Sequence, residues 1–357
     1  MLLLKSSLAQ DLTDPAALRT ALQQAIELEH STIPPYLYAL YSLIQGKNDA
    51  IAALIQSVVI EEMTHMALAC NILNAIGGAP VIDSPDFIPQ YPGPLPGTVE
   101  SQLTVPLAPF SLDLVKNVFM VIEEPEDPLN YPVVGLRAAA APPLTIGQFY
   151  EKIREALIAN GEGIFTGDTS RQVSATYMGI TPVTNLAQAV AAIDLIVEQG
   201  EGTTTSPQAS PTELAHYYRF AEIYHGRQLV PTTAAVPVGA EDAEPFDDGY
   251  SYSGPAIAFD PAGVYPVVTN PKAAQYAPGT LARNDCDTFN YSYTGLLQAL
   301  HQTFNGTPAA IQGAIGAMFT LKTQAIGMMQ VVIKPGSPTT AGPSFEYQPT
   351  LPADQSA

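Results

Sequence analysis

The sequence contains no tryptophan, two cysteines and few basic residues. Lys and Arg number 14 against 34 Asp and Glu, which gives a net charge of −20. A protein that binds a phosphate backbone needs the opposite sign, so we expect no nucleic-acid partner. Cys70 and Cys286 form no CxxC motif, and Cys70 lies in an apolar helical stretch that predicts a buried thiol. Nothing in this pattern requires an oxidising compartment, and we expect a cytoplasmic protein.

Long hydrophobic runs and targeting signals are also scarce. The apolar residues Met1–Leu4 are followed at once by Lys5, without the hydrophobic core or cleavage site of a signal peptide. The apolar stretch Ile51–Ile60 is interrupted by Gln56 and Ser57 and is short for a membrane span. We therefore expect no membrane partner.

The residues that are present predict a mainly α protein. Hydrophobic residues make up 46% of the 357, and 33 prolines with 26 glycines indicate long irregular segments between helices. Apolar residues at helical spacing favour a four-helix bundle in residues 1–230, with a long crossover over 78–110. We expect residues 231–357 to form a loop-rich extension with two helices. The predicted helices are a hairpin over 14–77 with a kink at Pro34-Pro35, then 111–123, 145–158, 185–201, 212–229, 291–304 and 308–332.

Glu62 and His65 form an i, i+3 pair on one helical face among apolar neighbours. A carboxylate and an imidazole on such a face are costly unless they pair or bind a metal. Glu29, on the other helix of the hairpin, lies roughly 25 Å from the turn, while Glu62 and His65 lie roughly 20 and 24 Å from it. The three side chains should therefore meet at one level. One Glu opposite a Glu-x-x-His pair is half of a carboxylate-bridged di-iron site.

The other half of such a site has two candidate sources. One is the segment Glu213–His216, which could face Glu198 or Glu201 across the preceding loop; the other is Glu222 with His225. If the helices are straight, Glu222 and His225 match the level of the first half better. Two glycines, at 200 and 202, weaken that assumption because the helix before the loop could end at mid-bundle.

Several other polar and sulfur side chains are expected to have structural roles. Glu61 should face solvent, and His30 and His301 should lie at the surface or pack. The methionines of the last helix, Met318, Met328 and Met329, should belong to the core.

At these residues the sequence resembles a known family. The matching segments are IELEHSTIPPYLYALYS, EEMTHMALACNILNAIGGAP, IEEPEDP, TIGQFYEKI, IVEQGEGTTT, ELAHYYRFAEI, FNYSYTGLLQAL and GPSFEY. They resemble the ferritin-like family named for iminophenyl-pyruvate dimer synthase, which includes the ferritin-like portions of violacein- and rebeccamycin-pathway enzymes. The resemblance runs from Leu12 to Tyr347. It implies a ferritin-like four-helix bundle with a long crossover and extra C-terminal helices.

The resemblance also implies which residues hold a metal. The family-supported ligands are Glu29, Glu62, His65, Glu201 and His216. This set disagrees with the straight-helix alternative, and we favour His216 over His225 as the ligand. Glu123 belongs to the family motif IEEPE; a substrate-pocket role and a structural role at a helix end are both open for it.

The resemblance and the ligand pattern together predict a non-haem iron oxidoreductase. It would hold one or two iron ions, with manganese as the alternative metal, and would use O₂ or peroxide on a small amine, imine or amino-acid-derived substrate. The alternative is a non-enzymatic iron-binding or storage-like protein. Against it, the large crossover and the extra C-terminal helices would cap a pocket rather than build a cage. Assembly into a homo-oligomer is a further open expectation.

Overall fold

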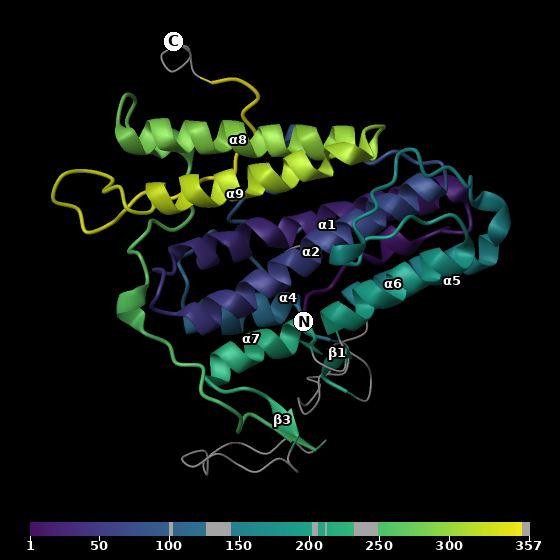
Figure 1. Ribbon diagram of the computed structural model, residues 1–357, viewed down its shortest axis with the longest axis horizontal. Helices are drawn as coiled ribbons and strands as arrows, with labels where there is room; N and C mark the ends of the chain where they lie inside the picture. Colours follow the sequence, from purple (N-terminus) through teal and green to yellow (C-terminus); the bar gives the residue numbers. More distant parts are fainter. Residues whose placement is uncertain (100–102, 126–143, 202–205, 211–212, 232–248, 352–357) are drawn as a thin grey trace.

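The computed structural model describes residues 1–99, 103–125, 144–201, 206–210, 213–231 and 249–351. Two long antiparallel helices, α1 (Pro15–Ser42) and α2 (Asp49–Ala75), form its centre (Figure 1). α1 begins where the Asp14 side chain accepts a hydrogen bond from the Ala16 amide, 3.2 Å away. Pro15 follows at the first helical position, where no intrahelical donor is lost. The hairpin predicted over 14–77 is confirmed.

α1 continues through Pro34 and Pro35, so the predicted kink does not interrupt the helix. Proline cannot donate a backbone hydrogen bond to the preceding turn. The Ser31 carbonyl, which Pro35 leaves without its usual donor, accepts a hydrogen bond of 2.6 Å from the Tyr91 hydroxyl. Tyr91 belongs to the crossover after α2, and the crossover therefore supplies the donor that the helix lacks.

The two helices that face α1 and α2 are each built from two pieces. In the first, one piece is the continuous helical stretch of α3 (Leu112–Leu114), the π-helical turn η3 (Val115–Phe119) and α4 (Met120–Ile122). The other piece is α5 (Ile146–Asn160). The second consists of α6 (Leu186–Glu201) and α7 (His216–His225). α5 and α6 pack at one end of the α1–α2 pair, and α4 and α7 pack at the other (Figure 1). Both breaks therefore fall near the middle of the bundle.

The helix predicted over 212–229 is shorter in the structure. Glu213–Leu214 form strand β2, which pairs antiparallel with β1 (Gln208–Ser210). α7 starts only at His216 and ends before Gly226, whose φ of +69° is the left-handed conformation that glycine adopts easily at a helix C-terminus.

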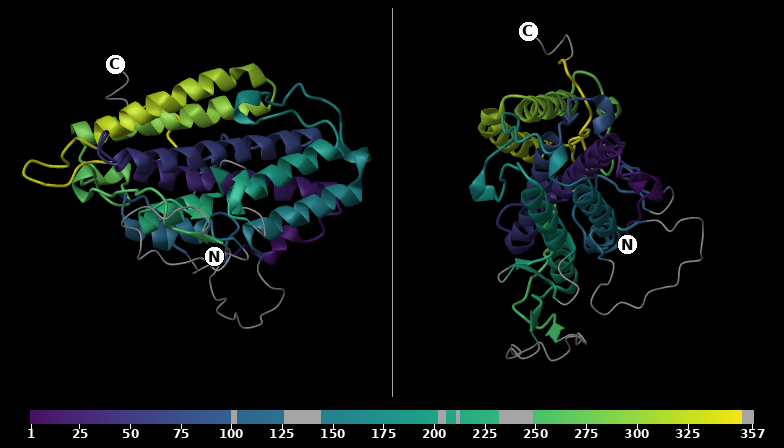
Figure 2. Two further views of the ribbon diagram at one scale, coloured as in Figure 1. Left: turned by 60° about the horizontal axis from the view of Figure 1, so that its bottom comes forward. Right: turned by 90° about the vertical axis from the view of Figure 1, so that its right-hand side faces the viewer.

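A C-terminal helical pair covers the side of α1 and α2 opposite α4–α7 (Figures 1 and 2). It consists of α8 (Leu281–Phe304) and α9 (Ile311–Met328). α8 begins at Leu281 and not at Tyr291, because Thr280 caps it by accepting a hydrogen bond of 3.3 Å from the Arg283 amide. The polar first turns of α8 have no clear apolar periodicity, which is why the sequence prediction missed them.

The remaining regular elements are short. Strand β3 (Val230–Pro231) pairs with β4 (Tyr250–Ser251). The 3₁₀ turns are η1 (Ser6–Ala9), η2 (Pro85–Phe87), η4 (Glu162–Ile164), η5 (Thr176–Met178), η6 (Pro261–Gly263), η7 (Ala273–Gln275) and η8 (Pro308–Ala310). The predicted mainly α bundle with a crossover and extra C-terminal helices is confirmed, whereas the division at residue 230 stays a prediction.

Helix α2 has the length and composition of a membrane span, contrary to the estimate from its apolar run alone. It is the one helix of this kind in the part of the chain that the structure describes. However, 56% of its most apolar window is buried inside the protein, where it packs against α1, α6 and α7. Core helices meet the same criterion.

Candidate metal centre

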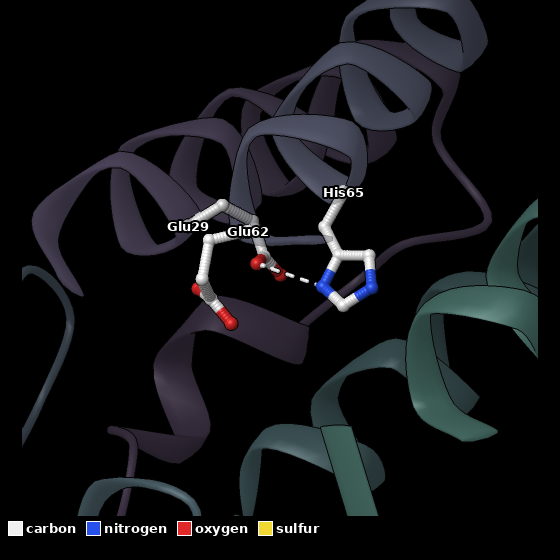
Figure 3. Close-up of side chains that lie close together, drawn as sticks. All are labelled: Glu29, Glu62 and His65. Carbon is white, nitrogen blue, oxygen red and sulfur yellow. Dashed lines mark ion pairs between the residues drawn. The ribbon is translucent and has the colours of Figure 1, made fainter. Parts of the chain in front are cut away.

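Glu29, Glu62 and His65 converge between α1 and α2 (Figure 3). All three are buried, with exposed fractions of 5%, 3% and 2%. One potential ligand atom from each lies within 4.8 Å of the others, and His65 Nδ1 is 3.5 Å from Glu29 Oε2. The i, i+3 spacing places Glu62 and His65 on one face of α2, and the matching distance from the turn brings Glu29 to the same level.

A second cluster consists of Glu62, Glu123 and His216, and it shares Glu62 with the first. His216 Nδ1 lies 2.9 Å from Glu62 Oε1 and 3.4 Å from Glu123 Oε2. The rings of His216 and His65 stack with their centroids 5.4 Å apart. Five buried donor side chains therefore form one continuous centre.

Helix ends bring Glu123 and His216 to this level. Glu123 is the C-cap of α4, and His216 is the first residue of α7. Since α6 stops at Glu201 and the chain passes through β1 and β2 before α7 begins, His216 enters at the middle of the bundle. The assumption of straight helices placed His216 closer to the end of the bundle than Glu62 and His65, and this assumption is wrong.

The outer nitrogen of each histidine is held by a side chain outside the two clusters. His65 Nε2 lies 2.8 Å from Gln199 Oε1, and His216 Nε2 lies 2.9 Å from Glu61 Oε2. Glu61 also receives a 2.9 Å ion pair from Arg219, so the expectation that Glu61 faces solvent is wrong. Such partners fix the ring orientation and direct Nδ1 towards the centre.

The Nδ1 atom of His216 tests whether a metal fits. It is buried and makes no hydrogen bond, although the carboxylate oxygens of Glu62 and Glu123 lie close to it. A buried nitrogen without a hydrogen bond is costly unless something else binds it. Nε2 faces Glu61, and Nδ1 faces the two carboxylates. This arrangement fits a cation between them.

Each carboxylate has one oxygen held by a hydroxyl group. The Thr32 hydroxyl donates to Glu62 Oε2 at 2.6 Å. In the same way, the Tyr150 hydroxyl donates to Glu29 Oε1 and the Tyr36 hydroxyl donates to Glu123 Oε1. In all three cases the other oxygen faces an imidazole. The hydroxyls thus orient the carboxylates, and sequence reasoning assigned this role to none of the three residues.

The charges of the centre are strongly coupled. Burial, with the carboxylates of Glu123 and Glu29, raises the pKa of Glu62 to about 7. Burial acts to lower the pKa values of His65 and His216, but the carboxylates outweigh it: Glu29 raises the pKa of His65, and the carboxylates around His216 raise its pKa well above the usual range. These shifts arise because buried carboxylates crowd together, so that positive charge among them is favoured. A divalent ion would supply such charge.

The structure does not bring the other predicted ligands to the centre. Glu198 is exposed on α6, and His225 is exposed at the end of α7 with its ring stacked on Tyr252 at 4.1 Å. Glu222 is buried but lines a different cavity and accepts a 2.8 Å hydrogen bond from the Leu229 amide. Glu201 ends α6, and its side chain lies outside the described residues.

A cavity of about 40 Å³ adjoins the carboxylates. Glu29, Glu62, His65 and Glu123 form its polar side. Its other walls are mostly apolar and include Leu28, Ile122, Ile146, Ile196 and Val197. A small molecule in this space would meet donor groups on one side and carbon on the other.

Comparison with known proteins agrees with this architecture. Residues 22–225 match the Ferritin-like family. The chain is 25% identical, over 389 aligned positions, to the dichlorochromopyrrolate synthase of Lentzea aerocolonigenes; the match covers 91% of this chain and 35% of that protein. The chain thus spans about a third of that relative's length.

The solved structure of a ferritin-like protein from Caulobacter vibrioides has the same fold. It superimposes with a TM-score of 0.59 at 24% identity, and the match covers 93% of this chain and 97% of that one. The family match covers more than half of the sequence, and the bundle with its buried carboxylates and histidines agrees with it. The chain therefore belongs to the ferritin-like family.

Proposed function

We propose that this protein is a non-haem iron oxidoreductase that uses O₂ or peroxide on a small amine, imine or amino-acid-derived substrate. The observation that carries the proposal is the sharing of Glu62 between two buried carboxylate–histidine clusters. A carboxylate common to both clusters suits two adjacent cations. Glu29, Glu62 and His65 would hold one ion, and Glu62, Glu123 and His216 the other. Glu123 is thereby proposed as a ligand in addition to its place at the substrate cavity.

The donor chemistry supports iron, with manganese as the alternative. Carboxylates and imidazoles suit both metals, and the described centre contains no thiolate that would favour a softer ion. When bound, iron supplies redox chemistry towards O₂ or peroxide. The hydroxyls of Thr32, Tyr36 and Tyr150 orient the carboxylates, and burial of the centre excludes bulk water.

The cavity beside the centre supports a small substrate. Its apolar wall would pack against the carbon part of the molecule, while the polar part faces Glu29 and Glu123. Similarity to a synthase of Lentzea aerocolonigenes supports a biosynthetic role, although the chain covers only 35% of that enzyme. Cytoplasmic location and self-association stay predictions.

Anaerobic loading with Fe(II) tests the proposal. After removal of free metal, the protein should retain two iron ions per chain, and anomalous scattering from crystals should place one ion at each cluster. After exposure to air, the iron-loaded protein should consume O₂, and the rate of O₂ consumption should depend on the amine or amino acid that is added. A protein without bound metal would contradict the proposal, and hundreds of iron ions per assembly would favour the storage alternative.

A further inference from the structure

A second cavity, of about 80 Å³, lies between α1–α2 and the C-terminal pair α8–α9. Figure 1 shows α8–α9 and α4–α7 on opposite sides of α1 and α2. The cavity lies on the side of α8–α9, and the metal centre lies on the side of α4–α7. Residues adjacent in sequence face the two spaces: Glu29 and Glu62 belong to the centre, while His30 and Met63 line the cavity. Neighbouring side chains on a helix point about 100° apart, so the same two helices form a wall of each.

The lining of this cavity is almost entirely apolar. Its flexible part consists of four methionines, at positions 63, 66, 178 and 318. Most of the remaining lining consists of leucine, isoleucine, phenylalanine and tyrosine side chains from α1, α8 and α9. Methionine side chains adapt their shape to what they contact, and their sulfur packs well against aromatic rings. A charged ligand is excluded because this lining offers no opposite charge.

One polar atom at this cavity has no partner. His30 is 3% exposed, and its Nε2 lies 2.8 Å from the Tyr293 hydroxyl. Its Nδ1 is buried and makes no hydrogen bond. Burial lowers the pKa of His30 to about 3, which keeps the imidazole neutral at physiological pH. His30 was expected at the surface or in packing, and the structure buries it. Packing explains its contact with Tyr293 but leaves Nδ1 without a hydrogen bond.

We propose that this cavity binds a small, uncharged aromatic molecule with a single hydrogen-bonding group. The ring would lie among the methionine side chains, and the polar group would bond His30 Nδ1. The cavity is smaller than the roughly 150 Å³ that holds benzene in another protein, so the ligand has at most one ring and the methionine side chains must shift to admit it. This site is separate from the metal centre and does not depend on iron.

Fluorine NMR titration of the metal-free full chain with 4-fluorophenol and fluorobenzene tests the proposal. Both should bind, the phenol roughly five- to tenfold more tightly because it alone can bond His30. His30→Phe should remove this difference while fluorobenzene still binds. His225→Phe, which changes an exposed histidine, is the matched control and should retain the difference. Equal affinity of the two probes for the unchanged protein would overturn the proposal.

Two further variants locate the site. Ile315→Trp fills the cavity from α9 and should weaken the binding of both probes at least tenfold. Circular dichroism checks that this variant folds. Glu62→Ala disrupts the metal centre and should leave both affinities within about twofold. Loss of binding in Glu62→Ala but not in Ile315→Trp would place the probes at the metal centre and contradict the proposal.

A crystal soak with 4-bromophenol gives an answer that does not depend on variants. The bromine anomalous signal should appear between α1–α2 and α8–α9, with the phenol oxygen within hydrogen-bond distance of His30 Nδ1. A bromine signal found only elsewhere, or none at a concentration that saturates the NMR titration, would refute the assignment.

Discussion

The two helical pairs around the metal centre differ in continuity. α1 and α2 run for 28 and 27 residues, and their interiors place Glu29, Glu62 and His65. The facing pair is interrupted and places Glu123 and His216 at helix ends. Inside a helix, backbone hydrogen bonds on both sides fix the level and direction of a side chain, whereas at an end the adjoining loop decides them. One half of the centre therefore follows from periodicity and the other from where helices stop.

The interrupted half is held in place by a polar network. Arg219, in the first turn of α7, donates to the Leu214 carbonyl at 2.6 Å, to the Ser57 hydroxyl at 3.0 Å and to Glu61 at 2.9 Å. It thereby ties α7 to the preceding strand and to α2. On the continuous helix, the outer nitrogen of His65 contacts Gln199, which carries no charge. Where helical continuity does not fix a ligand, buried charge and hydrogen bonding do so.

The largest effect is expected from Glu62, which both clusters share. Glu62→Ala should reduce bound iron from two ions per chain to none, because each cluster loses a carboxylate. Elemental analysis after anaerobic loading with Fe(II) measures this. Glu198→Ala, on the exposed face of α6, is the control and should retain both ions. One full equivalent of iron left in Glu62→Ala would show that the two halves bind independently.

His216 tests the interrupted half separately. His216→Ala should lose one of the two ions together with O₂-dependent activity, while His225→Ala should keep both. The same iron analysis, combined with an oxygen electrode, distinguishes them. The opposite pattern would mean that the level of a residue on a straight helix is a better guide than the structure around His216.

The sequence predicts the continuous half well and the interrupted half less well. Counting residues from the turn is enough to bring Glu29, Glu62 and His65 together, since nothing breaks the two helices. The same count failed for Glu222 and His225, because α7 begins only at His216. The family resemblance favoured His216 over His225, and it pointed to Glu123 as a substrate-pocket or helix-end residue, not as a ligand.

Long-range polar contacts account for the rest of what sequence could not predict. Glu61 was expected at the surface, yet His216 and Arg219 reach it from a helix about 155 positions further along the chain. No local spacing encodes this contact. Tyr150 and Gln199 approach the centre in the same way, each from a helix that is distant in sequence.

A smaller effect is expected from the partner of His216. Glu61→Gln keeps the shape of the side chain but removes the charge that orients the imidazole. We expect roughly ten- to 100-fold weaker binding of one iron ion, with the other unchanged. Competition with a chelator measures both affinities, and Glu198→Gln is the matched control. If Glu61→Gln binds both ions as tightly as the unchanged protein, the hydrogen bond to Glu61 does not position His216.

The last prediction concerns stability and not metal binding, and it tests Glu222, the ligand that straight helices would have supplied. Burial raises the pKa of its carboxyl to about 7, although the Leu229 amide and Arg219 act to lower it. A carboxyl with a folded-state pKa above the unfolded value of 4.5 stabilises the protein at low pH, and this contribution is lost as the pH rises through 7. Relative to Glu222→Gln, the metal-free protein should lose about 3 kcal/mol of unfolding free energy between pH 4.5 and pH 8.

Urea unfolding of both proteins across this range measures the difference, and iron loading of Glu222→Gln completes the test. We expect two ions per chain, since Glu222 lines a cavity separate from the centre. A difference in stability that does not change with pH would mean that water reaches the carboxyl. A loss of iron in Glu222→Gln would mean that α7 contributes a ligand from its interior as well as from its end. The contrast between ligands at helix interiors in one pair and at helix ends in the other would then not hold.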